Sequence, residues 1–188
     1  MRTSARRASH RSIQYYIALG SNLGDREATL RRAWVMLSDL CQAAKLSPLY
    51  ETRPMYVVDQ PLYINAVGQV SCALEPNDML DALHRIEQEL GRDRAREIRM
   101  GPRTLDLDIL LCGSRIVKSP KLIIPHPRIT ERMFVLVPLL ALSPRLRDPR
   151  TGIPYADSLA LLRSGSRATD AGGVYLYPSG EYSNPSRT

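Results

Sequence analysis

The sequence has few cysteines and none of the spacings that a zinc site or a disulfide framework requires. The three that are present, Cys41, Cys72 and Cys112, are far apart and lie within apolar stretches, so we expect reduced thiols in the core. The three histidines are equally scattered and form no local metal-binding motif. These absences argue against a protein held together by disulfides or zinc.

The sequence also lacks a long hydrophobic run. Its apolar stretches fall below the ~18 residues of a membrane-spanning helix, and the first residues lack the apolar centre of a secretory signal. We therefore predict a cytoplasmic protein with no membrane partner. The formal charge of +7 indicates an anionic partner, but charge alone does not choose between nucleic acid, a lipid surface and a phosphorylated small molecule.

Composition changes at both ends of the 188-residue chain. Residues 1–12 are rich in arginine and serine and contain no acid, which is typical of a flexible basic arm. Residues 163–188 are rich in serine and glycine and also contain proline and asparagine, which predicts a low-complexity C-terminal tail. Residues 13–162 are long enough for a single well-buried domain, and we predict one there.

Hydrophobic patterns within this central region indicate both strands and helices. Apolar residues follow Asp25, a candidate cap, at helical spacing, and Pro76 opens a second helix that ends at Gly91. The predicted strands are Tyr15–Leu19, Lys45–Thr52, Leu62–Leu74 and a segment over 105–111, and two later helices are predicted within Val135–Leu142 and Tyr155–Leu162. The order β, α, β, β, α, β predicts an α+β, ferredoxin-like core, in which helices cover a mainly antiparallel sheet as an α/β/α sandwich.

The most informative segment is Gly101–Leu111, which places two carboxylates on an apolar strand. Successive strand residues point to opposite faces, so Leu105, Leu107, Ile109 and Leu111 are expected to enter a core. Asp106 and Asp108 then project together on the other face, where they repel each other unless cations lie between them. An acidic, half-exposed strand face is the alternative, and the strand alone leaves both interpretations open.

Arginines precede this strand. Residues 92–100 contain four arginines, and Arg103 lies three residues further on. Cations beside metal-binding acids indicate a polyphosphate ligand, because Mg²⁺ on the carboxylates together with arginine forks would neutralise its charge. A solvated charged loop is the alternative.

With these motifs in place, the chain resembles the 6-hydroxymethyl-7,8-dihydropterin pyrophosphokinase family of the folate pathway. The resemblance covers nearly the whole core, and the Arg-Thr-Leu-Asp-Leu-Asp-Ile run is its most specific part. The matching pieces are Tyr16–Gly24, Tyr50–Thr52, Asp59–Ala66, Ile86–Glu87 with Gly91–Arg92, Gly101–Leu111, Ile124–Arg128, Arg132 and Phe134.

The resemblance implies a role for each matching residue. It implies that Asp106 and Asp108 hold two Mg²⁺ ions and that Arg92 and Arg103 contact the phosphates as catalytic residues. The implied ATP-binding residues are Glu87, Arg96, Arg99, Lys121, His126 and Arg132. The implied pterin-binding residues are Thr52, Pro54, Met55, Tyr63, Asn65 and Phe134. The arm departs from the family pattern, because Met100 stands where well-known members have tryptophan and the arm is one residue longer.

The activity implied is transfer of diphosphate from MgATP to the hydroxymethyl group of the pterin, with release of AMP. We expect a monomer whose partners are these two small molecules, with no nucleic acid. One alternative is a basic, ferredoxin-like RNA-binding module, which should display aromatic residues on its sheet. Another is an ordinary kinase, which a Walker loop would favour, but the sequence has no Gly-x-x-x-x-Gly-Lys.

Overall fold

The computed structural model describes residues 12–55, 59–93, 101–165 and 173–178. The strands are β1 (Ile13–Ser21), β2 (Ala43–Leu46), β3 (Tyr50–Thr52), β4 (Tyr63–Cys72), β5 (Asp106–Cys112), β6 (Val117–Lys118), β7 (Ile123–Ile124) and β8 (Val174–Leu176). The helices are α1 (Arg26–Asp39), α2 (Pro76–Glu89), α3 (Met133–Leu142) and α4 (Tyr155–Arg163), with a 3-10 turn, η1 (Ile129–Glu131).

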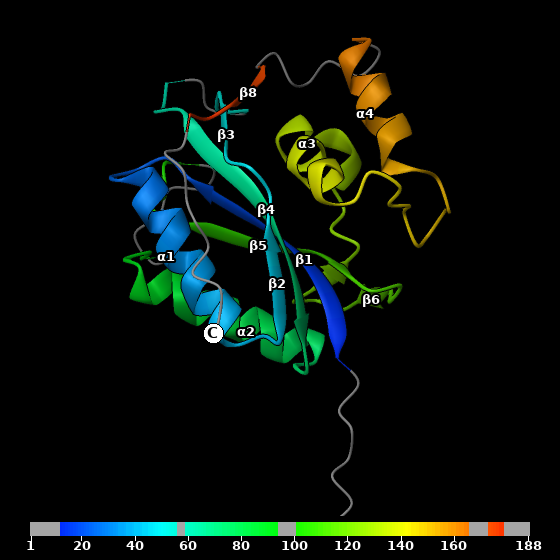
Figure 1. The fold of residues 1–188 in the computed structure, drawn as a ribbon, viewed down its shortest axis with the longest axis horizontal. Coiled ribbons are helices and arrows are strands. Elements are labelled where there is room, and N and C mark those ends of the chain that lie inside the picture. Colours follow the sequence, from blue (N-terminus) through cyan, green and yellow to red (C-terminus); the bar gives the residue numbers. More distant parts are fainter. Residues whose placement is uncertain (1–11, 56–58, 94–100, 166–172, 179–188) are drawn as a thin grey trace, which may run out of the picture.

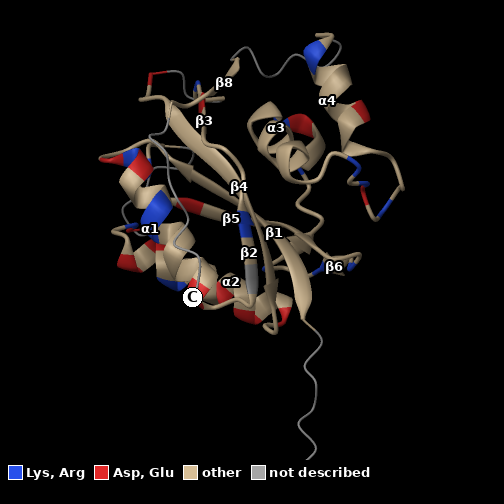
Figure 2. Cartoon of the chain, viewed as in Figure 1, with Lys and Arg blue, Asp and Glu red and all other residues tan. Residues whose placement is uncertain are grey.

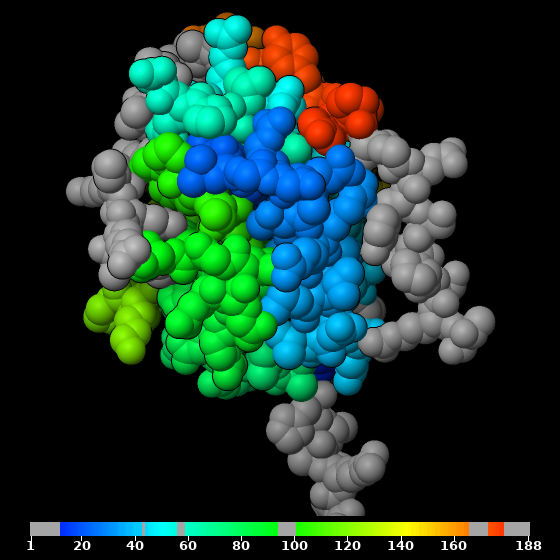
Figure 3. Space-filling model, turned by 90° about the vertical axis from the view of Figure 1, so that its left-hand side faces the viewer, coloured from blue at the N-terminus to red at the C-terminus, as the bar shows by residue number. Residues whose placement is uncertain are grey.

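One antiparallel sheet forms the middle layer (Figure 1). Its strand order is β5-β1-β4-β3-β8, and β2 pairs with β4 beside this path. Helices α1 and α2 pack on one face over one hydrophobic cluster, and α3 and α4 pack on the other face over a second. Figure 3 views the first of these faces, on which α1 and α2 lie side by side. The predicted α+β, ferredoxin-like class with helices on both faces is confirmed.

The first helix begins and packs as its sequence predicts. The side chain of Asp25 accepts a hydrogen bond from the Ala28 N–H at 3.0 Å and caps the helix. Trp34 faces the sheet and is only 8% exposed. Its ring lies against Gly68 on β4 so closely that an added Cβ at Gly68 would come within 2.4 Å of it. Glycine at this position therefore lets the indole pack on the sheet.

The second helix also has the predicted ends. Pro76 is at its first turn, and Gly91 follows it with φ of 89°. Met79, Leu83 and Ile86 are buried against the sheet. This packing brings the last turn of α2 over the start of β5.

Strand β5 follows the predicted alternation for its first residues and then departs from it. Leu105, Leu107 and Ile109 lie in the cluster beneath α1 and α2. The pairing with β1 shifts between Tyr16 and Ile17, so one extra residue of β5 bulges there. Leu111 therefore lies in the opposite cluster, and the prediction that it shares a face with Leu105 was wrong.

Two further differences concern segments with weak sequence patterns. The predicted strand Lys45–Thr52 is two separate strands, β2 and β3, which pair with different parts of β4. Composition predicted a tail over residues 163–188, yet residues 174–176 form β8 and pair with β3. No helix in the described part of the chain is long and apolar enough to cross a membrane. All three cysteines are buried and free, as predicted.

Candidate active site

A pocket opens between the sheet and α3, at the end of the sheet where β1, β3, β4 and β5 come together. Ten residues predicted for the site line it, which are Thr52, Pro54, Met55, Tyr63, Asn65, Arg103, Asp106, Asp108, Arg132 and Phe134. They come from three strands, two loops and one helix. The fold therefore gathers positions that are up to about eighty residues apart in sequence.

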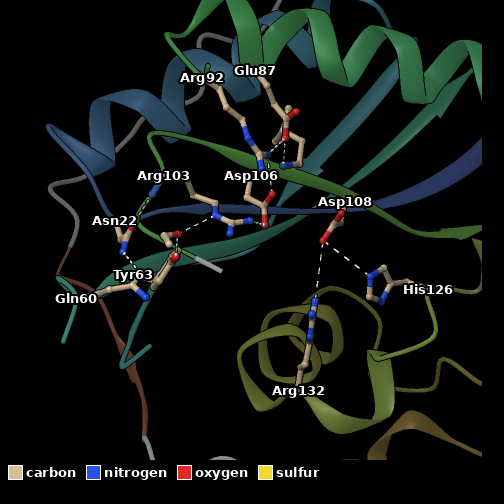
Figure 4. Close-up of polar contacts among 12 residues, drawn as sticks. Asn22, Gln60, Tyr63, Glu87, Arg92, Arg103, Asp106, Asp108, His126 and Arg132 are labelled. Carbon is tan, nitrogen blue, oxygen red and sulfur yellow. Dashed lines mark hydrogen bonds and ion pairs between the residues drawn. The ribbon is translucent and has the colours of Figure 1, made fainter. Parts of the chain in front are cut away.

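Asp106 and Asp108 both face this pocket, as strand alternation predicts (Figure 4). Asp106 accepts a hydrogen bond from Arg92 at 2.7 Å and forms an ion pair with Arg103 at 3.2 Å. Burial by itself would raise the pKa of the Asp106 carboxyl, but the charges and hydrogen bonds of the two arginines outweigh burial and lower that pKa. Asp106 is therefore a firmly ionised carboxylate.

Asp108 has a different electrostatic environment on the same strand. Its nearest cation in the described part of the chain is Arg132, at 4.0 Å, and the His126 ring lies 3.9 Å away. The surrounding protein displaces water from the carboxyl, and the negative charge of Asp106 adds to the effect, so the pKa of Asp108 is raised to about 6. Among the described residues, Asp108 has no partner as close as the two arginines of Asp106, and a bound cation would compensate its charge.

His126 is held as a neutral ring beside Asp108. Burial, followed by the charges of Arg132 and Arg128, lowers the pKa of His126 to about 4. Its Nδ1 accepts the Arg128 backbone N–H at 3.1 Å, which places the ring proton on Nε2, the atom that faces Asp108. The backbone N–H of His126 donates to the Leu110 carbonyl at 2.9 Å and fixes the loop that carries His126 to β5.

A second hollow lies on the other side of Asp108, between α2 and the segment after β6. Predicted ATP-binding residues Lys121 and His126 line it, together with His84. Asp108 lines this hollow as well as the first pocket. The carboxylate therefore lies where the two spaces meet.

The first pocket combines amide and aromatic groups at one end. The Nδ2 of Asn65 donates to the Thr52 hydroxyl at 2.7 Å, and both residues are nearly buried. This bond fixes the orientation of the amide. An added Cβ at Gly20 would lie 3.1 Å from the Asn65 Oδ1, so a glycine on β1 leaves room for that atom.

Arg132 lies over Phe134 at the other wall of the pocket. Its guanidinium carbon is 5.6 Å from the ring centroid, which is within range of a cation–π contact. The Nε atom of Arg132 is buried and has no hydrogen-bond partner among the described residues. An unsatisfied buried donor on a cation is suited to an anionic ligand.

Glu87 and Arg92 lie behind the pocket rather than on its wall. Glu87 is 1% exposed, and its carboxylate accepts hydrogen bonds from Arg92 and, at 2.8 Å, from the Leu107 N–H. Arg92 in turn reaches Asp106, so the three side chains form a continuous ionic chain from α2 to β5 (Figure 4). These contacts suit a positioning role for Glu87, whereas the sequence resemblance implied ATP binding. Arg96, Arg99 and Met100 lie outside the described residues.

Asn22 is a site residue that the sequence did not identify. It is 1% exposed, and its Oδ1 accepts the Arg103 N–H at 2.7 Å. Its Nδ2 donates to Gln60 at 3.2 Å and to the Pro61 carbonyl at 3.4 Å. Asn22 thus joins the turn after β1, the loop before β4 and the segment that carries Arg103. The sequence resemblance included Asn22 in the matching piece Tyr16–Gly24 but gave it no role.

The donor set at the two aspartates fits Mg²⁺. Carboxylate oxygens are the ligands that Mg²⁺ prefers, and it is usually bound by one or two carboxylates together with waters and substrate phosphates. Within the described ranges, no group of three or more histidine, cysteine or acidic residues is placed to hold a metal. This is consistent with a site that the substrate completes.

Comparison with known proteins identifies the family. Residues 16–144 match the model of the 7,8-dihydro-6-hydroxymethylpterin-pyrophosphokinase (HPPK) family. The chain is 48% identical over 142 residues to the folic acid synthesis protein fol1 of Pneumocystis carinii, covering 75% of this chain and 19% of that protein. It is 44% identical over 138 residues to the 2-amino-4-hydroxy-6-hydroxymethyldihydropteridine pyrophosphokinase of Bacillus subtilis, covering 72% of this chain and 81% of that protein.

Solved structures agree with this assignment at the level of the fold. An HPPK-DHPS triple mutant from Plasmodium falciparum superimposes with a TM-score of 0.65 at 14% identity, covering 87% of this chain and 47% of that one. The chain thus spans about a fifth of fol1 and about half of the malarial protein, but about four fifths of the bacterial enzyme. The family match extends over more than half of the chain. It includes both aspartates and the residues that line the first pocket and the second hollow. The chain belongs to the 7,8-dihydro-6-hydroxymethylpterin-pyrophosphokinase family.

Proposed function

We propose that this chain transfers diphosphate from MgATP to the hydroxymethyl group of 6-hydroxymethyl-7,8-dihydropterin and releases AMP, as a step of folate biosynthesis. The observation that carries this proposal is the position of Asp108 between two differently lined spaces. One space has aromatic and amide groups suited to a flat heterocycle, and the other has Lys121 and His126. A reaction that joins a pterin to part of a nucleotide requires such an arrangement.

The pterin is proposed to occupy the first pocket. Tyr63 and Phe134 supply aromatic faces to a planar ring, and Asn65 supplies both a donor and an acceptor to its edge. Thr52 holds the Asn65 amide in one orientation through the 2.7 Å hydrogen bond. The hydroxymethyl oxygen of the pterin would then point towards the aspartates.

The triphosphate is proposed to extend from the second hollow across the aspartates. Arg103 and Arg132 both line the first pocket beside the aspartates, and the buried Nε of Arg132 has no hydrogen-bond partner among the described residues. Two Mg²⁺ ions would be held by Asp106 and Asp108, and when bound they supply positive charge to the phosphate oxygens as the bond to AMP breaks. Glu87 and Arg92 hold Asp106 at its place on β5.

Direct transfer to the pterin oxygen is favoured over a covalent phospho-enzyme. The Nδ1 of His126 is occupied by the Arg128 N–H, and all three cysteines are buried in the core. The contribution of the chain is therefore to position the two substrates and to compensate the phosphate charge.

The RNA-binding alternative is not favoured. Helices cover both faces of the sheet, so its aromatic residues are not displayed to single-stranded RNA. Figure 2 shows acidic residues on β5, and these would repel a nucleic-acid backbone. The monomeric state, the cytoplasmic location and the single domain over residues 13–162 stay predictions of the sequence.

A product assay tests the proposal. Purified protein is incubated with Mg²⁺, ATP and 6-hydroxymethyl-7,8-dihydropterin, and the nucleotides and pterins are separated. We expect AMP and the pterin diphosphate in equal amounts, and no product when EDTA replaces Mg²⁺. Formation of ADP with a pterin monophosphate, or no turnover, would overturn the proposal.

A further inference from the structure

Strand β8 lies outside the segment that matches the family, yet it completes the sheet next to the first pocket. The family match ends at residue 144, and β8 spans Val174–Leu176. Its three residues pair antiparallel with β3, with Val174 opposite Thr52 and Leu176 opposite Tyr50. In Figure 3 the orange-red residues of β8 lie at the edge of the cyan region that contains β3.

Backbone pairing holds β8 in place, and the partly buried side chain of Tyr177, directly after the strand, packs against the cluster beneath α1 and α2. Tyr175 and Leu176 are 66% and 67% exposed, so their side chains contribute little apolar burial. The Tyr177 N–H donates to the Leu49 carbonyl at 2.9 Å, which makes these two a hydrogen-bonded pair. Alternation along an antiparallel ladder makes Glu51 and Tyr175 the next hydrogen-bonded pair. The outward peptide groups of β3 are therefore satisfied by β8.

The strand that β8 covers carries one wall of the pocket. Thr52 is the last residue of β3, and Pro54 and Met55 follow it directly on the pocket wall. The side chain of Thr52 accepts the hydrogen bond that orients Asn65. Strands β3 and β8 also both lie beside α3, which carries Phe134 on the opposite wall (Figure 1).

Strand β3 is short and has few other attachments. It pairs with β4 over three residues, and Glu51 forms an ion pair with Arg26 at 2.9 Å. A three-residue strand at a free edge would expose a row of unpaired backbone groups and would fray readily. With β8 in place, β3 becomes an interior strand.

We propose that β8 is a positioning segment for the pterin pocket, which holds β3, and with it the Thr52–Met55 wall, in the geometry that binds the pterin. This inference rests on the proposed function for the identity of the ligand. It assigns a role in substrate binding to a part of the chain beyond the family match. Lys121 and His126 line the second hollow, whereas the Thr52–Met55 wall lines the first pocket, so nucleotide binding should be unaffected.

The test compares two substitutions at one position in the full-length chain. Tyr175→Pro removes the N–H that pairs with β3, whereas Tyr175→Ala removes the same exposed ring and keeps that N–H. We expect the proline variant to raise the KM for pterin by about tenfold or more, with the KM for ATP within about twofold of wild type. The alanine variant should match wild type in both constants.

Hydrogen exchange of the Glu51 amide reports the pairing independently of any activity. The proposal predicts faster exchange at Glu51 in the proline variant and unchanged exchange in the alanine variant. Faster exchange with an unchanged KM for pterin would overturn the proposal while leaving the proposed function standing. A rise in both KM values would also overturn it, because the effect would then not be confined to the pterin wall. If the wild-type protein fails to turn over the pterin at all, the proposed function itself fails, and this inference falls with it.

Discussion

At the scale of single residues, the two aspartates of β5 show how one strand gives two carboxylates different properties. Asp106 is held by two arginines, which lower its pKa. Burial and the charge of Asp106 raise the pKa of Asp108 to about 6, and its nearest cation among the described residues is Arg132, at 4.0 Å. Strand alternation was sufficient to predict that both face one side. The unequal environments were not predictable, because Arg92, just after α2, and Arg132, just before α3, reach the strand through tertiary packing.

Replacing Asp108 with asparagine tests its proposed role directly. We expect Asp108→Asn to lower kcat/KM by at least ~10²-fold, because a neutral amide is a weak ligand for Mg²⁺ and leaves the phosphate charge uncompensated. The thermal midpoint should not fall, because the nearest cation among the described residues, Arg132, is 4.0 Å from Asp108. Asp81→Asn, on the exposed side of α2, is the matched control. Turnover of Asp108→Asn at the wild-type rate would remove Asp108 from the reaction.

Glu87 is expected to act on stability and on the position of Asp106. Glu87→Gln keeps the shape of the side chain but removes the charge that faces buried Arg92, so the free energy of unfolding should fall by about 2–3 kcal/mol. Urea denaturation measures this change, and Glu89→Gln, two residues further along α2 and exposed, should be neutral. Equal stability of the two variants would show that the Glu87 charge does not hold the ionic chain together.

At the scale of elements, the long periodic segments were predictable and the short or irregular ones were not. The caps at Asp25 and Pro76 locate α1 and α2 within one or two residues. The bulge in β5 was not visible, because Leu110 and Leu111 are both apolar and fit either face. The three residues of β8 are strand formers, but a three-residue segment is too short to show a hydrophobic periodicity.

The contact between α1 and β4 gives a prediction about packing. Gly68→Ala places a methyl group within 2.4 Å of the Trp34 ring, which is wedged between helix and sheet. We expect a loss of about 1–3 kcal/mol in the free energy of unfolding, as for other overpacked cores. In a Trp34→Leu background the same substitution should cost less, and a double-mutant cycle measures the difference. An equal cost in both backgrounds would contradict the proposed contact.

The turn between α3 and α4 gives a prediction about pH. Asp148 is 5% exposed, and hydrogen bonds from Arg150 lower its pKa below the ordinary 3.8. A lowered pKa stabilises the folded protein above pH 3.8, and this contribution is lost as the pH falls through the folded-state value. Asp148→Asn should therefore reduce stability by about 1–2 kcal/mol at pH 7, and the difference from wild type should shrink towards pH 3. A difference that is constant with pH would contradict the role of the Asp148 charge.

At the scale of the whole molecule, the fold brings two spaces together at one strand. The sheet edge with β5 separates a pocket beneath α3 from a hollow beside α2, and Asp108 lines both. The charge of +7 is consistent with polyphosphate as the anionic partner, although charge alone did not select it. Motifs in the sequence identified ten residues that line the first pocket. They gave no role to Asn22, which lies behind the pocket and holds two other loops together.

The central claim is that the β- and γ-phosphates move together to the pterin. ATP labelled with ³²P at the β-phosphate tests this claim most directly, because the label distinguishes diphosphate transfer from transfer of the γ-phosphoryl group alone. We predict that the label leaves the nucleotide completely and appears in the pterin product, while label at the α-phosphate stays in AMP. Retention of the β-label in ADP would contradict diphosphate transfer.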